Sequence, residues 1–280
     1  METGQKFMVQ TNNNLEILTN LRLSIQVSLN GLSFCVLDES TNSITHLEQI
    51  GFNKKLTPFE LLDSIKNIFK NHKVLKNTFN TVNVIYVNEL SALVPKPLFD
   101  EDHMADYLKF NSKILKSDFI AFDDIAANDS VNVYVPYVNI NNFIYEKFGA
   151  FSYKHFSTIL IENILKIEKN TAKPKMYISI SKVHFEIIVV QKGKLLFYNM
   201  FDYSSKEDFI YYILFTIEQL KLNPETIEVF LLGDINQEHE LFKIAYKYIR
   251  FVDFGNVQSN YSFSGDISNN HSNFVLLNSF

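Results

Sequence analysis

A hydroxyl, an amine, an imidazole and a carboxylate follow closely between Ser181 and Glu186. Because side chains alternate between the two faces of a strand, His184 and Glu186 share one face while Phe185 points to the other. This pattern is typical of a turn followed by a half-exposed strand. It does not match a known catalytic arrangement.

The histidines are scattered along the chain. None forms a pair at helical ligand spacing or a cluster with the single cysteine, so no zinc site is predicted. The sequence also contains no Walker-type phosphate loop and no nucleophile elbow. The seven histidines are His46, His72, His103, His155, His184, His239 and His271.

Composition indicates a soluble globular protein with room for two lobes. The chain has 280 residues, of which 46% are hydrophobic and 20% charged. Its 31 acidic and 26 basic residues are mixed and give a net charge of -5, which disfavours nonspecific nucleic-acid binding. Cys35 lies in an apolar strand pattern, where we expect a small core side chain in a reducing cytoplasm.

No targeting signal is apparent, because the polar N-terminal residues lack an apolar core segment. The most apolar helix candidate, Phe209 to Ile217, is too short to span a bilayer and is flanked by charged residues. We therefore expect a buried core helix there and no direct membrane insertion.

A hairpin pattern occurs twice. In the first copy, strands at 23–29 and 32–38 meet across Asn30-Gly31, a dipeptide that favours a type I′ turn, and a third strand covers 44–52. In the second copy, strands at 176–181, 185–190 and 195–198 follow each other, with the last two joined by a turn at 191–194.

An amphipathic helix follows each hairpin. Thr57, Pro58 and Glu60 form a capping-box sequence ahead of an apolar stripe, and Ser205 caps a second helix that ends at Asn223-Pro224. The other predicted strands cover 82–87, 118–122, 131–135, 227–233 and 250–254, and the other predicted helices cover 100–110, 140–148, 153–167 and 237–248. The apolar end at 274–277 is expected to dock on the protein.

The repeated order of three strands, helix, strand, helix, strand resembles the two lobes of the actin-like ATPase fold, a duplicated ribonuclease H-like unit. The passage from Gln191 to Asp208 adds to this resemblance. The chain is similar to the actin-like cytoplasmic components of type II secretion and type IV pilus systems, and more closely to a bacterial family of unknown function. The resemblance implies an α/β protein with mixed sheets flanked by helices, with a first lobe at 15–170 and a second lobe plus tail at 174–280.

Active members of this fold carry an aspartate and a glycine in each first hairpin, which serve hydrated Mg²⁺ and the phosphates. The matching positions here are Gln26 and Ser28 in the first copy, and Ser179 and Ser181 in the second. Neither copy supplies the metal-binding charge or the space for phosphate. The resemblance therefore implies a protein that has lost ATPase chemistry.

Ribonuclease H-type nucleases hold two metal ions on carboxylates, and Gln26 argues against this chemistry as well. Asp38 and the pair Asp123-Asp124 are the remaining candidate acids. We expect them to be solvated turn residues.

The 26 phenylalanines and 14 tyrosines lack the basic neighbours of a single-strand nucleic-acid platform. Most are expected in the core, and an apolar surface for a protein partner is possible at Tyr198, Phe201 and Tyr203. The residues expected in the core include Phe59, Phe69, Phe119, Phe197, Phe209 and Phe230.

These observations favour a noncatalytic actin-fold interaction or scaffold protein of the bacterial cytoplasm. No catalytic, cofactor-binding or metal-binding residues and no cofactor are predicted, and a protein partner is expected. The alternative is a divergent nucleotide-binding enzyme that holds ATP between the lobes through Ser28, Ser181, Lys182 and Gly233.

Overall fold

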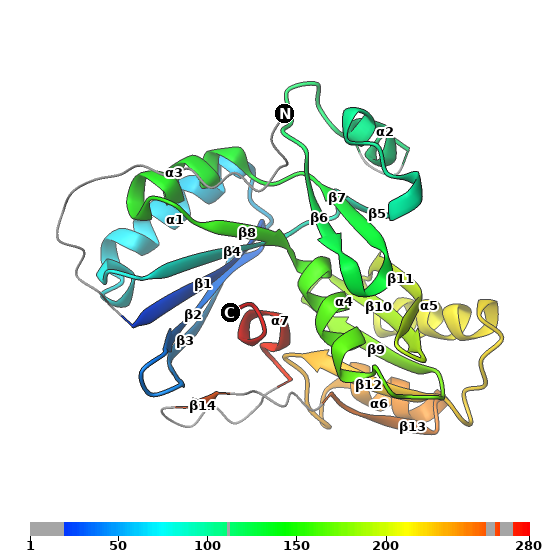
Figure 1. The fold of residues 1–280 in the computed structure, drawn as a ribbon. Coiled ribbons are helices and arrows are strands. Elements are labelled where there is room, and N and C mark those ends of the chain that lie inside the picture. Colours follow the sequence, from blue (N-terminus) through cyan, green and yellow to red (C-terminus); the bar gives the residue numbers. More distant parts are fainter. Residues whose placement is uncertain (1–19, 111–112, 256–260, 264–270) are drawn as a thin grey trace. The chain divides into compact units, whose positions relative to one another are not determined.

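The computed structural model describes residues 20–110, 113–255, 261–263 and 271–280 (Figure 1). Its contacts divide the chain into two compact units. Among the described residues, the first unit contains 20–159, 261–263 and 275–280, and the second contains 160–255 and 271–274. The expectation about targeting concerns residues 1–19, which lie outside the described residues. The division into lobes at 15–170 and 174–280 stays a prediction.

The first unit contains a six-stranded mixed sheet with the order β14-β3-β2-β1-β4-β8. Strand β1 pairs antiparallel with β2 and parallel with β4, so it lies at the centre of the unit. The strands are β1 (Leu21–Ser28), β2 (Gly31–Asp38), β3 (Ser43–Gly51), β4 (Thr81–Val87), β8 (Ser152–His155) and β14 (Ser262–Phe263).

The second unit repeats this topology in a five-stranded sheet with the order β11-β10-β9-β12-β13. Strand β9 has the place of β1, because it pairs antiparallel with β10 and parallel with β12. In both units the third, second and first strands of the repeat are therefore consecutive neighbours in the sheet, and a parallel strand follows them. The strands are β9 (Lys175–Ile180), β10 (His184–Gln191), β11 (Lys194–Asp202), β12 (Glu228–Gly233) and β13 (Phe251–Phe254).

Helices connect the parallel strands of each unit. Capping boxes at Thr57 and Ser205 start the helices that follow the hairpins, as the sequence predicts. The first unit contains α1 (Pro58–Asn71), α2 (Met104–Leu108) and α3 (Val138–Phe148), and the second contains α5 (Lys206–Gln219) and α6 (Glu240–Tyr248). The division between the units falls within α4 (Phe156–Ile167).

A small three-stranded sheet is inserted between β4 and α3 of the first unit, with the order β5-β7-β6. It is formed by β5 (Ser91–Pro95), β6 (Ala121–Ile125) and β7 (Ser130–Tyr134). Its own apolar core includes Val94, Leu108 and Val133. The predicted hairpin at 118–135 is confirmed with shifted boundaries, whereas β5 and β8 are strands that the sequence analysis missed. The short 3-10 helices are Val74–Lys76, Lys96–Leu98, Glu101–His103 and Ala126–Asn128.

The turn of the first hairpin differs from the prediction, whereas the second turn forms at the predicted residues. In the first hairpin Ser28 pairs with Gly31, and neither Asn30 nor Gly31 adopts a left-handed backbone, so the predicted type I′ turn is wrong. Gly31 serves a different purpose, because a Cβ there would lie 2.8 Å from the backbone oxygen of Ile50. In the second hairpin, Lys192 and Gly193 have φ of 54° and 69°, as a type I′ turn requires.

Each unit has its own apolar core between its sheet and helices. Leu61, Ile65 and Phe69 form the buried stripe of α1, as predicted. The expectation that Phe59 and Phe119 lie in the core is wrong, since they are 79% and 49% exposed. Phe59 lies in the first turn of α1, outside its apolar stripe, and Phe119 precedes β6.

The C-terminal segment packs within the first unit, which confirms that the tail docks. Val275, Leu276 and Leu277 in α7 (Phe274–Leu277) are buried. The Cys35 thiol is also buried, as predicted, and donates to the Leu276 carbonyl at 3.8 Å. The Ser279 hydroxyl and carbonyl bond Ser24 and Asn83, respectively.

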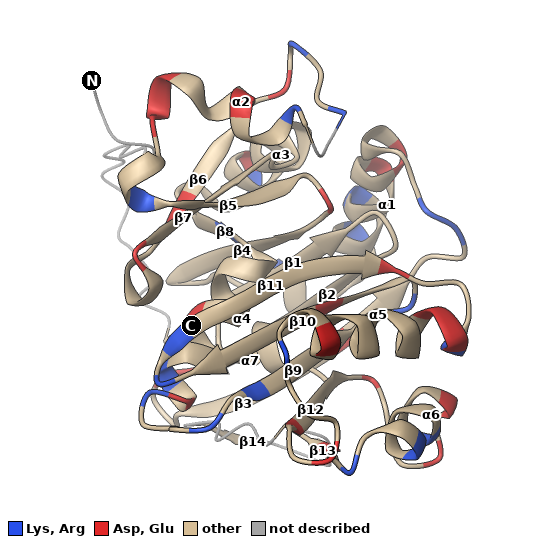
Figure 2. Ribbon diagram, turned by 90° about the vertical axis from the view of Figure 1, so that its right-hand side faces the viewer, with Lys and Arg blue, Asp and Glu red and all other residues tan. Residues whose placement is uncertain are grey.

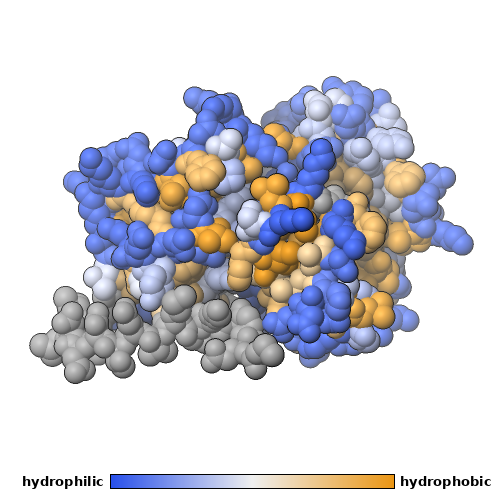
Figure 3. All heavy atoms as spheres, turned by 90° about the horizontal axis from the view of Figure 1, so that it is seen from above, coloured by the Kyte–Doolittle hydropathy of each residue, from blue (hydrophilic) through white to orange (hydrophobic). Residues whose placement is uncertain are grey.

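Acidic and basic residues are interspersed along the helices and loops (Figure 2). On the face seen in Figure 3, apolar residues lie in small groups among hydrophilic ones. Isolated exposed apolar residues are ordinary, so they do not by themselves define a binding surface. Within the described residues, no helix combines the length and apolar character needed to span a bilayer.

Gly233, at the end of β12, is required by the close approach of two strands. Its φ is +112°, and a Cβ there would lie 2.3 Å from the backbone oxygen of Ile180 in β9. Gly149 has a comparable φ of +78°, but a Cβ there would meet no atom within 4 Å. Gly149 therefore provides a matched control for backbone strain without overlap.

We predict that Gly233→Ala destabilises the protein more than Gly149→Ala. Both substitutions force a non-glycine residue into an unfavourable backbone region at about 1–3 kcal/mol. Gly233→Ala also adds steric overlap with the backbone of Ile180, which costs about 1–3 kcal/mol more. Urea unfolding of the two variants measures the difference, and equal losses of stability would contradict a special role for Gly233.

Candidate functional site

In the first unit, the two residues that the resemblance matches to nucleotide-binding positions are Gln26 and Ser28, and both lie in β1. Gln26 lies in β1 and supplies no carboxylate. The Ser28 hydroxyl donates to the Gly31 carbonyl at 3.1 Å and accepts from the Asn30 backbone N–H at 3.2 Å. Ser28 is therefore engaged in closing the turn.

In the second unit, Ser179 is buried in β9 and lies opposite Glu186 of β10. Glu186 is fully buried, so the predicted half-exposed strand is wrong, although Phe185 does point to the opposite, apolar face. Burial raises the pKa of Glu186 to about 8, opposed in part by the Ser179 hydroxyl. At pH 7 this carboxyl group is mainly neutral and offers little charge to Mg²⁺.

The remaining residues of the alternative nucleotide site are also placed in the second unit. The Ser181 backbone closes a turn with the His184 carbonyl, and its own carbonyl accepts from the Tyr203 hydroxyl at 2.7 Å. Lys182 is exposed. Gly233 is accounted for by the approach of β12 to β9.

The candidate acids of a nuclease site do not come together. Asp38 accepts from the Ser40 backbone and hydroxyl in a turn, as predicted. Asp124 forms a half-exposed ion pair with Lys96. In the described part of the chain, these acids belong to no group of three possible metal ligands.

Asp123 was expected in a solvated turn, but it lies in β6 and is buried. Its carboxylate accepts from the His155 backbone N–H, the Thr158 hydroxyl and the Tyr134 hydroxyl at 2.8, 2.7 and 3.1 Å. Burial raises its pKa to about 6 despite these bonds. Because the carboxylate meets the backbone of His155 and not its ring, this network is structural and does not form a catalytic triad.

The aromatic residues considered for a partner surface are packed in the second unit. Phe201 stacks on Tyr212 with ring centroids 4.6 Å apart, and Tyr203 contacts Phe185. Tyr198 is half-buried in β11. The more exposed aromatic side chains of this unit include Tyr211 and Phe215 of α5.

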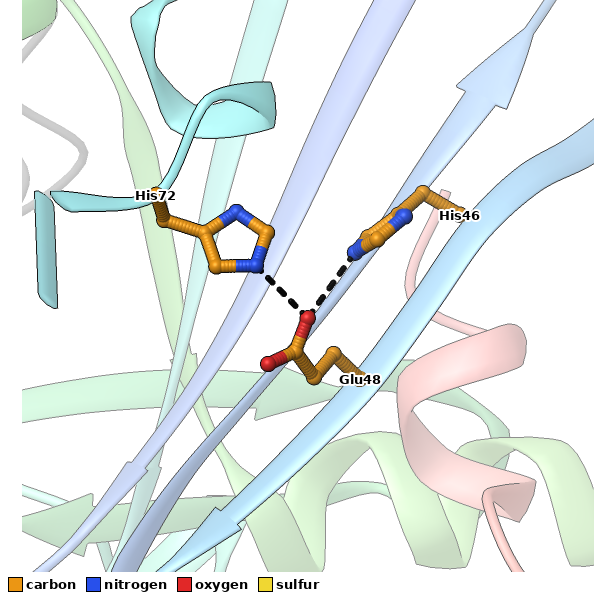
Figure 4. Close-up of side chains that lie close together, drawn as sticks. All are labelled: His46, Glu48 and His72. Atoms are coloured by element: carbon orange, nitrogen blue, oxygen red, sulfur yellow. Dashed lines mark hydrogen bonds and ion pairs between the residues drawn. The ribbon is translucent and has the colours of Figure 1, made fainter.

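The structure brings together three residues that the sequence analysis left apart. His46 and Glu48 lie two residues apart in β3, and His72 caps the C-terminus of α1 (Figure 4). Their side chains point toward one another and form the group of possible metal ligands found among the described residues. The two-residue spacing on a strand is a visible signal, but His72 is brought in by the tertiary fold.

Known proteins with a similar sequence or structure agree with the topology described above. The model of the family described as "Protein of unknown function (DUF3822)" matches residues 10–252. The chain belongs to the DUF3822 family. Among curated proteins, none matches the sequence.

A crystal structure of a Bacteroides thetaiotaomicron protein of unknown function with an actin-like ATPase fold is similar to this DUF3822 chain. It is 24% identical with a TM-score of 0.77, over 92% of this chain and 96% of that chain. The structure of a PilM-PilN type IV pilus biogenesis complex has a TM-score of 0.55 at 12% identity, over 91% of this chain and 96% of that chain. The DUF3822 chain therefore has the actin-like ATPase fold that its strand order predicts.

We predict that Glu186 makes this DUF3822 protein less stable as the pH rises from about 4.5 to about 8. Its folded-state pKa of about 8 lies above the ordinary glutamate value of 4.5, so the folded state retains a proton that the unfolded state loses. Each unit by which the folded-state pKa exceeds the unfolded-state pKa favours folding at low pH by roughly 1.4 kcal/mol. This advantage disappears as the pH rises through the window between the two pKa values.

Urea unfolding at several pH values checks this prediction. Glu186→Gln should flatten the decline in unfolding free energy, whereas Glu146→Gln, at an exposed position of α3, should leave it unchanged. Identical pH profiles for the wild-type protein and Glu186→Gln would show that Glu186 does not carry this dependence.

Proposed function

We propose that this DUF3822 protein is a noncatalytic actin-fold component that acts by binding a protein partner in the bacterial cytoplasm. The main support is that the repeated sheet topology is present in both units, while the positions that the resemblance matches to the metal-binding aspartates hold Gln26 and Ser179. Function in this proposal comes from the surface of a stable scaffold. Nucleotide turnover has no part in it.

The side-chain environments support this proposal over a divergent nucleotide-binding enzyme. Ser28 is engaged in its turn, and Gly233 is needed for backbone packing. Glu186, the acid opposite Ser179, is held mainly neutral by burial. None of these residues therefore needs a nucleotide to account for its position.

The PilM neighbour supports a role in protein binding by analogy. That protein is seen in a complex with PilN in type IV pilus biogenesis. A shared fold does not transfer the partner, so we propose the class of ligand, a protein, and leave out its identity. Nucleic acid is disfavoured as a ligand because acidic and basic residues are mixed, with a net charge of -5.

Thermal unfolding with and without about 5 mM Mg-ATP tests the proposal. A ligand at 100 times its Kd stabilises the folded state by about 2.7 kcal/mol, so even modest binding would raise the Tm. We expect no change in Tm and no ATP hydrolysis.

A reproducible rise in Tm would instead favour the nucleotide-binding alternative. Lys182→Ala is then the informative variant, because Lys182 is exposed and its loss should not disturb folding. Gly233 is unsuitable for this purpose, since its substitution is expected to disturb the strands themselves.

A further inference from the structure

The cluster of His46, Glu48 and His72 joins two elements of the first unit. The Glu48 Oε2 atom lies 3.2 Å from His46 Nε2 and 2.7 Å from His72 Nε2. The three atoms all lie within 4.8 Å of one another. Both imidazoles direct Nε2 toward the same carboxylate oxygen of Glu48, so three possible ligand atoms are gathered in one place (Figure 4).

The fold holds these side chains in place. Alternation along β3 puts His46 and Glu48 on the same face of the sheet, opposite Val36 and Phe34 of β2. The Phe34 ring stacks on His46 at 5.4 Å and meets the edge of His72 at 5.0 Å, measured between centroids. This buried ring supports both imidazoles from the core side.

The backbone of His72 is fixed as well. Its N–H bonds the Ile68 carbonyl, and the residue leaves α1 in an extended conformation. Its Nδ1 atom is buried and makes no hydrogen bond in the described structure, so no second bond turns the ring away from Glu48. The pair His72 and Glu48 is separated by 24 residues, so the contact depends on α1 packing on the sheet.

The distances are close to those of a zinc site. Zn²⁺ binds imidazole nitrogen and carboxylate oxygen at about 2.0–2.2 Å, which places tetrahedral ligands about 3.3 Å apart. The 3.2 Å contact between His46 and Glu48 already matches, and the 2.7 Å contact between His72 and Glu48 must open by roughly half an ångström.

The cluster is also accessible. The side chains of His46, Glu48 and His72 are 30%, 36% and 23% exposed, so an ion can enter and retain water as a further ligand. Among the described residues, the ion pairs of Glu48 are those with the two histidines, and no lysine or arginine competes for its charge.

We propose that His46, Glu48 and His72 bind a divalent transition-metal ion, with Zn²⁺ as the best chemical match. Imidazole and carboxylate are ligands that suit this ion. The Glu48 carboxyl oxygens are acceptors, and each imidazole presents either a proton or a lone pair at Nε2 according to its tautomer. On binding, each Nε2 lone pair goes to the metal and the ring proton is on Nδ1. The ion would link β3 to the end of α1. This inference is independent of the proposed function.

Calorimetric titration of the untagged, metal-stripped full chain with ZnCl₂ tests the proposal. We expect one ion per chain and a rise in Tm on binding, because the ion binds the folded state. Titration of the wild-type chain with CoCl₂ should give the visible absorption bands of a Co²⁺ ion bound to nitrogen and oxygen ligands. This measurement needs no variant.

Three variants assign the ion to the cluster. Glu48→Gln and His72→Gln should each weaken Zn²⁺ binding by at least about tenfold, because each removes a direct ligand. His103→Gln is the matched control, since His103 also contacts a carboxylate, Asp100, at 2.8 Å but lies outside the cluster. Its Zn²⁺ affinity should equal that of the wild-type protein.

The proposal is overturned if the wild-type chain takes up no Zn²⁺ and shows no Co²⁺ bands. It is equally overturned if binding persists unchanged in both Glu48→Gln and His72→Gln. Where a variant fails to fold, the wild-type stoichiometry and Co²⁺ spectrum still decide whether the chain binds a metal.

Discussion

The structure depends on the pairing of one central strand in each unit. Strands β1 and β9 pair antiparallel with the next strand of their hairpin and parallel with β4 and β12, respectively. Parallel neighbours need a crossover connection, which α1 and α5 provide. The apolar side chains that bury both strands, such as Leu23 and Ile178, fix this register without any ligand. A scaffold built in this way can persist when its metal-binding residues are replaced.

Several residues that the resemblance places at or near the nucleotide-binding positions of the fold have roles in packing and turns. Ser28 closes a hairpin turn, Gly233 allows β12 to approach β9, and Glu186 is buried beside Ser179. A buried carboxyl group with a raised pKa reduces stability near neutral pH, yet it need not indicate catalysis. The same reasoning applies to Asp123, whose carboxylate joins β6 to the start of α4.

Local patterns predicted the repeated hairpins and their helices because turn and capping signals act within a few residues. Thr57 with Glu60 shows this, since both halves of its capping box form. The burial of Asp123 and the meeting of His72 with Glu48 depend on contacts between residues 24 or more positions apart. Periodicity could not reveal them. The type I′ prediction for the first turn was wrong for a similar reason. Gly31 is explained by its close approach to the backbone of β3 and not by the geometry of its own hairpin.

The proposal that binding has replaced turnover is tested most directly on a complex purified from bacterial cells that express the tagged chain at native level. Its mass and dissociation rate would be measured with Mg-ATP and after enzymatic removal of nucleotide. The account predicts a complex with a defined protein partner, heavier than the 32.6 kDa chain, whose stability is the same in both conditions. A chain that purifies without a protein partner, or a complex that forms or dissociates according to nucleotide, would contradict it.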